Sequence, residues 1–272
     1  QSVIGIVFDA GASPFTISNN TITLAGNVIN QSSANQTIYS GITLAMNANF
    51  IAESGNLVFG GVSFGANTTS LTVNGSNDTL INNTISGNGS LLKSGAGTLR
   101  LSGTNTFKGN ITISDGNLAI LGGSAVPNAD AVSLNSANAT FTIGTSETIG
   151  SLQGVGTTAI ATNQILTINQ VGNTSYSGSI TGAGELKIAG AGTLTLSGSS
   201  TYGGGTTLLT GTLVLAGANS AGSGDIYQKF GEPNLLQVDT TGTITNNIVA
   251  PNLLATQNVI VKRKTMLTFV KV

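Results

Sequence analysis

Residues 95–123, GAGTLRLSGTNTFKGNITISDGNLAILGG, recur at residues 190–218 as GAGTLTLSGSSTYGGGTTLLTGTLVLAGA. The two stretches align without a gap at an offset of 95 residues, and fourteen of their twenty-nine positions are identical. The similarity continues upstream, where TISGNGSLL at residues 84–92 faces SITGAGELK at residues 179–187. An internal repeat of this length predicts a fold built by stacking copies of one supersecondary unit.

Each copy of the repeat consists of short alternating runs that are separated by turn residues. The runs TLRL (98–101), NITI (110–113) and NLAI (117–120) alternate apolar and polar residues, which is typical of β-strands. Ser-Gly, Asp-Gly and Gly-Gly follow these runs, and glycine reaches the positive φ of tight turns without steric cost. Similar runs occur at residues 21–24 and 56–59. The sequence therefore predicts an all-β chain.

Three all-β architectures fit this pattern of short strands separated by turn residues: a sandwich, a barrel and a solenoid. The repeat, with small turn residues and aliphatic residues on one side of each strand, favours a parallel β-solenoid. Leucine and isoleucine would then stack inside, while threonine, serine and asparagine form ladders outside. At about 20 residues per coil we expect roughly thirteen coils.

The composition excludes several classes of chemistry. The 272 residues include no cysteine, histidine or tryptophan, and only 7% of them are charged. Disulfides, thiolate nucleophiles, imidazole bases and Cys/His metal sites are therefore ruled out. The net charge of -1 argues against a nucleic-acid partner, and no apolar run is long enough to predict a membrane span.

One motif resembles a known family. The pattern Gly-Ala-Gly-Thr-Leu-x-Leu-Ser-Gly-x-x-Thr-aromatic-x-Gly, at residues 95–109 and 190–204, resembles the autotransporter-associated β-strand repeat. The resemblance implies a right-handed parallel β-helix at the surface of a Gram-negative-type bacterium or in its surroundings. It implies no catalytic residues and no cofactor. It leaves open whether the chain is a passenger fragment or a stand-alone secreted relative.

The acidic residues bear on catalysis, because β-helices also host polysaccharide lyases and hydrolases. Glycoside hydrolysis needs two neighbouring carboxylates, whereas Asp78, Asp115, Asp130 and Glu185 are scattered singly. We expect Asp115 to hydrogen-bond its own Ser-Asp-Gly turn, and Glu185 to pair with Lys187. The sequence thus predicts that the protein is not an enzyme and has no catalytic, cofactor-binding or metal-binding residues.

Two aromatic residues, Phe107 and Tyr202, occupy matching positions in the two copies of the repeat. Stacking in or over the core is the favoured interpretation for both, and a platform for a sugar ring is the alternative.

Changes in composition divide the chain into three regions. Residues 1–70 form N-terminal solenoid coils with a weaker repeat, residues 71–220 form the repeat array, and residues 221–272 form C-terminal coils with a terminal strand. Four of the nine basic residues, Lys262, Arg263, Lys264 and Lys271, lie in the last eleven positions. The simpler interpretation of this basic cluster is a solvated tail. The more specific interpretation is that the cluster contacts an acidic surface of another copy of the chain.

The two ends of the chain are short, apolar and strand-like, and a solenoid leaves strand edges at its ends. The residues expected to mediate self-association are Val3, Ile4, Ile6, Val7, Phe8, Val259, Val261, Lys262, Arg263, Lys264, Met266, Leu267, Phe269 and Val270. The main hypothesis is an extracellular structural protein that joins copies of itself end to end, as a filament or surface layer. The alternative is a monomeric passenger stalk or adhesin that contacts a host or neighbouring cell surface. A polysaccharide-active enzyme is the remote third hypothesis.

Overall fold

The computed structural model describes residues 1–66, 69–122, 124–127, 131–249, 258–262 and 268–270. The chain divides into two compact units, unit 1 (Gln1–Phe141) and unit 2 (Thr142–Val272). Each unit is a parallel β-solenoid, and together they comprise about twelve turns. This confirms the predicted fold class, while the right-handed winding and the region boundaries at residues 70 and 220 stay predictions.

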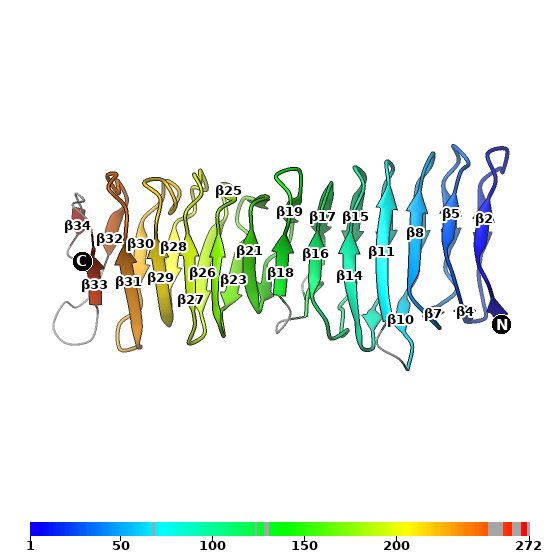
Figure 1. Cartoon of the computed structure of the whole chain (residues 1–272), viewed down its shortest axis with the longest axis horizontal. Helices are drawn as coiled ribbons and strands as arrows, with labels where there is room; N and C mark the ends of the chain where they lie inside the picture. Colours follow the sequence, from blue (N-terminus) through cyan, green and yellow to red (C-terminus); the bar gives the residue numbers. More distant parts are fainter. Residues whose placement is uncertain (67–68, 123, 128–130, 250–257, 263–267, 271–272) are drawn as a thin grey trace. The chain divides into compact units, whose positions relative to one another are not determined.

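The first five coils of unit 1 each contain three successive strands, and the coils after β15 contain two. Strands of successive coils pair in parallel on each face. Figure 1 shows its coils following one another in sequence order. The first face contains β1 (Ser2–Val3), β4 (Ile22–Leu24), β7 (Ile42–Leu44), β10 (Val62–Phe64) and β13 (Ile85–Ser86). The second face contains β2 (Ile6–Phe8), β5 (Val28–Asn30), β8 (Ala48–Ala52), β11 (Thr69–Gly75), β14 (Gly89–Lys93), β16 (Ile111–Ile113) and β18 (Ala131–Leu134). The third face contains β3 (Phe15–Ile17), β6 (Gln36–Ile38), β9 (Leu57–Phe59), β12 (Thr79–Ile81), β15 (Thr98–Leu101) and β17 (Asn117–Ile120). The strand β19 (Thr140–Ile143) contains the boundary between the units.

Unit 2 is built in the same way, with parallel pairing between coils. One face contains β20 (Glu147–Ile149), β23 (Ile165–Asn169), β26 (Glu185–Ala189), β28 (Thr206–Leu208), β30 (Ile226–Gln228), β32 (Asn247–Val249) and β34 (Thr268–Val270). A second contains β21 (Ser151–Gly154), β24 (Asn173–Tyr176), β27 (Thr193–Leu196), β29 (Gly211–Leu215), β31 (Asn234–Val238) and β33 (Asn258–Val261). The third contains β22 (Thr157–Ile160) and β25 (Ser179–Gly182).

The core follows from the alternation along the strands. In β15, Leu99 and Leu101 are fully buried, whereas Thr98 and Arg100 lie on the outer side. Aromatic residues add to the core of unit 1: the rings of Phe50 and Phe59 stack with their centroids 4.1 Å apart. Each fully buried leucine, isoleucine or phenylalanine contributes about 1.5–3 kcal/mol relative to exposure, so the stacked interior is the main source of stability.

Hydroxyl side chains form the outer ladder of the first face of unit 1. The outward residues of its five strands stand opposite one another in register and are Ser2, Thr23, Thr43, Ser63 and Ser86. Because polar but uncharged side chains cover the surface, the solenoid stays hydrophilic on that side with few charges. This explains how a chain with 7% charged residues folds with a solvated exterior.

Side-chain oxygens also connect the coils of unit 1 at the position just before the third face. Asn35 Oδ1 accepts the backbone N–H of Asn56 at 3.3 Å, and Asn56 Oδ1 accepts that of Asp78 at 3.0 Å. Asp78 Oδ1 in turn accepts the N–H of Thr98 at 2.9 Å. This ladder satisfies amide groups at a corner where the strand pairing ends, which is why Asn and Asp recur there.

The 95-residue repeat is visible in the local geometry of each unit. Residues 102–110 and 197–205 form no strand, and the aromatic residues Phe107 and Tyr202 within these segments are buried. This confirms the prediction that both rings pack in the core. Two turn glycines also match, since φ is +65° at Gly116 and +76° at Gly211.

Candidate functional site

A groove of about 930 Å³ lies in unit 2, at the corner where the chain passes from the β26–β28–β30 face to the β27–β29–β31 face. Three successive coils line it, through Gly190, Ala191, Thr210, Gly211, Thr212, Gly231, Glu232, Pro233, Asn234 and Leu235. Most of these residues are small, so backbone forms much of the surface. Concave surfaces of this size are common ligand sites.

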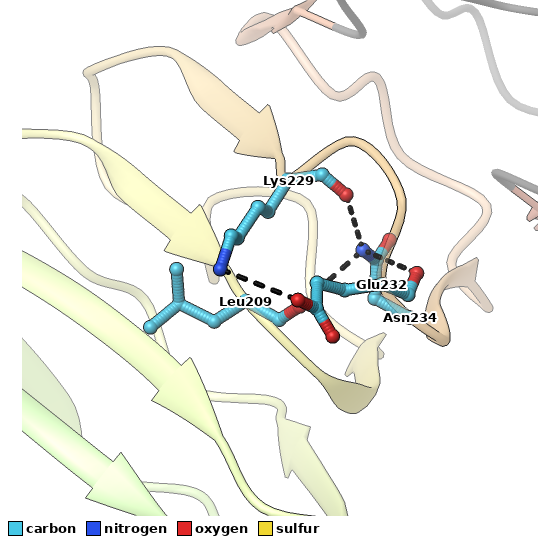
Figure 2. A network of polar contacts seen from close by, with 4 residues as sticks. All are labelled: Leu209, Lys229, Glu232 and Asn234. Atoms are coloured by element: carbon cyan, nitrogen blue, oxygen red, sulfur yellow. Dashed lines mark hydrogen bonds and ion pairs between the residues drawn. The ribbon is translucent and has the colours of Figure 1, made fainter.

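The loop after β30 forms one wall of the groove, and Asn234 holds it in place (Figure 2). Asn234 Nδ2 donates to the carbonyl oxygens of Lys229 at 2.8 Å, Glu232 at 3.2 Å and Leu209 at 3.5 Å. Asn234 Oδ1 accepts Gln228 Nε2 at 3.2 Å. The buried amide thus has hydrogen-bond partners within its own loop and, through Leu209, in the preceding coil.

The charged groups at the groove are Lys229 and Glu232, which form an exposed ion pair with 3.5 Å between Nζ and Oε1 (Figure 2). Exposed pairs of this kind contribute little to stability. Among the lining residues that the structure describes, Glu232 is the one with a titratable side chain. Glycoside hydrolysis requires two neighbouring carboxylates, and the described lining residues contribute one. Among the described residues, no group of three or more Asp or Glu side chains could hold a metal ion.

Lys93, at the end of β14, is the most unusual titratable residue of unit 1 because it is only 1% exposed. Its Nζ donates to the carbonyl oxygens of Ser94 at 2.8 Å, Gly95 at 2.6 Å and Asp115 at 3.3 Å. Burial lowers the pKa of Lys93 to about 8, although the nearby carboxylates of Asp115 and Asp78 act in the opposite direction. Lys93 thus ties two adjacent coils together from inside.

Sequence reasoning missed the role of Lys93, although a signal was present. In the strand GSLLK, Lys93 lies two residues after the buried Leu91. Side chains two residues apart in a strand face the same side, so Lys93 also faces the core.

The other ionisable groups with shifted pKa values are also structural. Burial raises the pKa of Tyr176 to about 12, although a hydrogen bond from Thr158 acts in the opposite direction. Burial likewise raises the pKa of Tyr202, whose hydroxyl hydrogen-bonds to Thr206 Oγ1. Burial alone would raise the pKa of Asp78, but hydrogen bonds from the Thr98 N–H and Arg100, with the Arg100 charge, lower it overall.

Two smaller expectations about polar residues are confirmed. Asp115 Oδ1 accepts the N–H of Gly116 at 2.9 Å, so this carboxylate stabilises its own turn. Lys187 Nζ lies 3.6 Å from Glu185 Oε2 on the strand β26.

The residues predicted to mediate self-association lie in two groups at opposite ends of the sequence. In the first group, Ile4 and Val7 are exposed, Val3 and Ile6 are half-buried, and Phe8 is buried. These five residues lie on or between β1 and β2, which pair with β4 and β5.

In the second group, Val259, Val261 and the exposed Lys262 lie on or beside β33, which pairs with β31. Phe269 and Val270 lie on β34, which pairs with β32. Arg263, Lys264, Met266 and Leu267 lie outside the described residues.

Comparison with known proteins gives one match. The family described as Passenger-associated-transport-repeat (PATR) matches residues 91–120 and 189–215. The chain contains two passenger-associated transport repeats. The first PATR segment ends with β17 and the second with β29, so both span the strandless turn and the buried aromatic residue described above. The comparisons with curated proteins and with solved structures found no match.

PATR segments are typical of autotransporter passenger domains, and this β-solenoid carries two stretches that match them. Such passengers are secreted, which indicates the cell surface or the extracellular medium. In the part of the chain that the structure describes, no helix is long and apolar enough to cross a membrane.

Proposed function

We propose that this chain is a structural, non-catalytic stalk segment of a secreted passenger. The observation that carries the proposal is the pair of PATR segments, each built on the same turn geometry within a parallel β-solenoid. The hydroxyl and amide ladders support the same interpretation. They give an exterior that is stable in water and that presents few charged groups for catalysis.

The location can be tested in a bacterium that carries the full gene. Protease treatment of intact cells should release peptides from residues 91–120 and 189–215, because a passenger is exposed outside the cell. A cytosolic marker protein should remain uncut in the same sample. Recovery of these peptides only after cell lysis would contradict the proposal.

Self-association through the terminal strands is the alternative function, and the exposure of Ile4 (87%) and Val7 (55%) favours it. Against donation of the C-terminal strands to another copy, β33 and β34 pair with β31 and β32 of the same chain and form the ends of their two sheets. Sedimentation velocity over a range of concentrations separates the two. A stalk segment should sediment as a monomer throughout. Concentration-dependent polymers that Ile4→Lys and Val7→Lys abolish would instead support end-to-end assembly.

A further inference from the structure

Six polar or aromatic side chains form what we call the polar strip, on or beside β26, β28, β30 and β32 of one face of unit 2. Figure 1 labels these four strands. They are Glu185, Lys187, Thr207, Asp225, Tyr227 and Asn247. The strand register aligns them, because Lys187 stands opposite Thr207 and Thr207 stands opposite Tyr227. The strip contains three of the nineteen Asp, Glu, Lys and Arg residues of the chain, so it is rich in charge for this protein.

Hydrogen bonds orient the side chains of the strip in two clusters. In the first, Glu185 Oε1 accepts Thr207 Oγ1 at 2.6 Å, and Glu185 Oε2 lies 3.6 Å from Lys187 Nζ. In the second, Asp225 Oδ1 accepts Asn247 Nδ2 at 2.9 Å, and Asp225 Oδ2 accepts the Tyr227 hydroxyl at 3.4 Å. Each carboxylate oxygen can accept further hydrogen bonds, so both clusters are pre-oriented and have unused capacity.

A glycine separates the two carboxylates. Gly205 lies in the coil between Glu185 and Asp225, since Leu186 N donates to Gly205 O at 3.1 Å and Thr206 N donates to Asp225 O at 2.9 Å. Its φ of +84° is left-handed, a conformation that favours glycine. Because glycine has no side chain and Gly205 is buried, only backbone separates the two acids in this column.

Beside this column the ring of Tyr227 is 45% exposed, so part of an aromatic surface faces solvent. An aromatic surface next to planar carboxylate and amide groups matches a saccharide. The C–H groups of a sugar ring pack on the aromatic ring, while neighbouring hydroxyls bond the carboxylates and amides. Successive strands are about 4.8 Å apart, so a chain of sugars lying across them can contact both clusters.

The net charge of the strip restricts the class of ligand that it can bind. Two carboxylates and one ammonium give -2 + 1 = -1, which disfavours phosphate-rich or uronate-rich polymers. We propose that the polar strip binds a neutral glycan, with Tyr227 as the stacking platform and Glu185, Asp225 and Asn247 as hydrogen-bonding groups. This goes beyond the stalk function, which stands whether or not the strip binds a glycan.

The test is affinity electrophoresis of the purified chain in gels that contain a neutral polysaccharide: xyloglucan, barley β-glucan or galactomannan. The expected result is retardation by at least one of them and none by polygalacturonate. Isothermal titration calorimetry with an oligosaccharide of the retarding polymer gives the affinity. Tyr227→Ala should then weaken binding at least tenfold, and Asp225→Ala should weaken it as well.

The matched control is Tyr39→Ala, which removes a tyrosine of unit 1 that is 59% exposed and lies outside the strip. This variant should bind like the wild type, and circular dichroism should show that all variants are folded. The proposal is overturned if none of the three neutral polymers retards the chain, if polygalacturonate retards it more strongly, or if Tyr227→Ala leaves the affinity unchanged.

Discussion

Asn105 and Ser200 stand at matching positions of the repeat and satisfy the same backbone group in their own units. Asn105 Oδ1 accepts the N–H of Ile85 at 2.6 Å, and Ser200 Oγ accepts the N–H of Ile180 at 3.0 Å. Both contacts are buried. A side-chain oxygen here replaces the carbonyl that a neighbouring strand would offer, because the segment that contains it forms no strand.

Asn105→Ala should therefore destabilise the chain by about 1–3 kcal/mol, because the N–H of Ile85 loses its buried acceptor. The contact from Asn105 Nδ2 to the carbonyl of Ala125, at 2.6 Å, is lost as well. Asn105→Ser should cost less, since serine performs this role at position 200. Urea denaturation of the three proteins measures the difference. Equal stability of Asn105→Ala and the wild type would show that the amide finds another partner.

The second copy of the repeat gives a matched test. Ser200→Ala removes the acceptor of Ile180 and should lower the free energy of unfolding by about 1 kcal/mol or more. In contrast, Ser200→Asn should be tolerated, because the first copy has asparagine at this position. The same urea titrations apply. A Ser200→Asn protein that is less stable than Ser200→Ala would mean that the two corners differ in shape.

The aromatic positions of the repeat predict that Tyr202→Phe and Phe107→Tyr lower stability by different amounts. Tyr202 has a hydroxyl partner in Thr206, whereas the position that matches Thr206 in the first copy is Ile111. Tyr202→Phe should cost about 0.5–1.5 kcal/mol, the net value of one hydrogen bond. Phe107→Tyr should cost more, about 1–3 kcal/mol or above, because it buries a hydroxyl beside an aliphatic residue. Thermal denaturation of both variants would refute this if Phe107→Tyr were the milder change.

Much of this architecture could be predicted from the sequence, because alternation and turn chemistry are local signals. The alternation in TLRL (98–101) predicts that Leu99 and Leu101 face the core, and both are buried. Phe107 and Tyr202, which occupy matching positions of the repeat, are both buried as well. Lys93 is different. The alternation along its strand places the side chain inside, whereas a charged lysine is usually found at the surface. The three carbonyl oxygens that accept its Nζ meet only when two coils stack, which a linear pattern does not reveal.

The candidate binding surfaces depend on the same kind of long-range placement. Glu185 and Asp225 are 225 - 185 = 40 residues apart and share one column only through the register of β26, β28 and β30. The wall of the groove depends on Asn234, which lies outside both copies of the repeat. Neither relationship follows from periodicity, because periodicity assigns a residue to a side of a strand and not to a neighbour in another coil.

The stability of the chain should rise with pH between about 8 and 9.5 because of Lys93. Its pKa is about 8 in the folded state, against 10.5 ordinarily, so in this window the unfolded state binds more protons. Stability therefore increases as pH rises, by about 2 kcal/mol for this group. Urea midpoints at pH 7.5, 8.5 and 9.5 measure the effect. The Lys93→Met variant should lack the increase, and an identical rise in that variant would assign it to another group.

Above pH 10 the buried tyrosines should reverse this trend. An unfolded tyrosine loses its proton near pH 10, whereas burial keeps Tyr176 protonated up to about pH 12. The folded state then binds more protons, so stability falls as pH rises. Tyr176→Phe should reduce the slope between pH 10 and 11.5 in urea titrations. A slope that is unchanged in this variant would mean that other groups cause the loss.

Gly116 cannot be replaced by alanine without strain. Its φ is +65°, and a Cβ would overlap the carbonyl oxygen of Gly95 and lie 2.6 Å from that of Gly97. It would also lie 2.8 Å from Lys93 Nζ, so the ammonium would lose its place at the corner. Gly116→Ala should therefore destabilise the chain by more than about 3 kcal/mol, since left-handed strain and overpacking both contribute.

A glycine in open space gives the matched control for Gly116. At Gly172 no atom lies within 4 Å of the place that an alanine Cβ would occupy, and φ is not positive. Gly172→Ala should therefore change stability by less than about 0.5 kcal/mol. Both variants are compared by urea denaturation at pH 7. If Gly116→Ala unfolds at the same urea concentration as Gly172→Ala, the close stacking of Gly116 on the Gly95 and Gly97 carbonyls does not limit this corner. A large loss at Gly116 alone would instead explain why glycine occupies the matching position, Gly211, in the second copy.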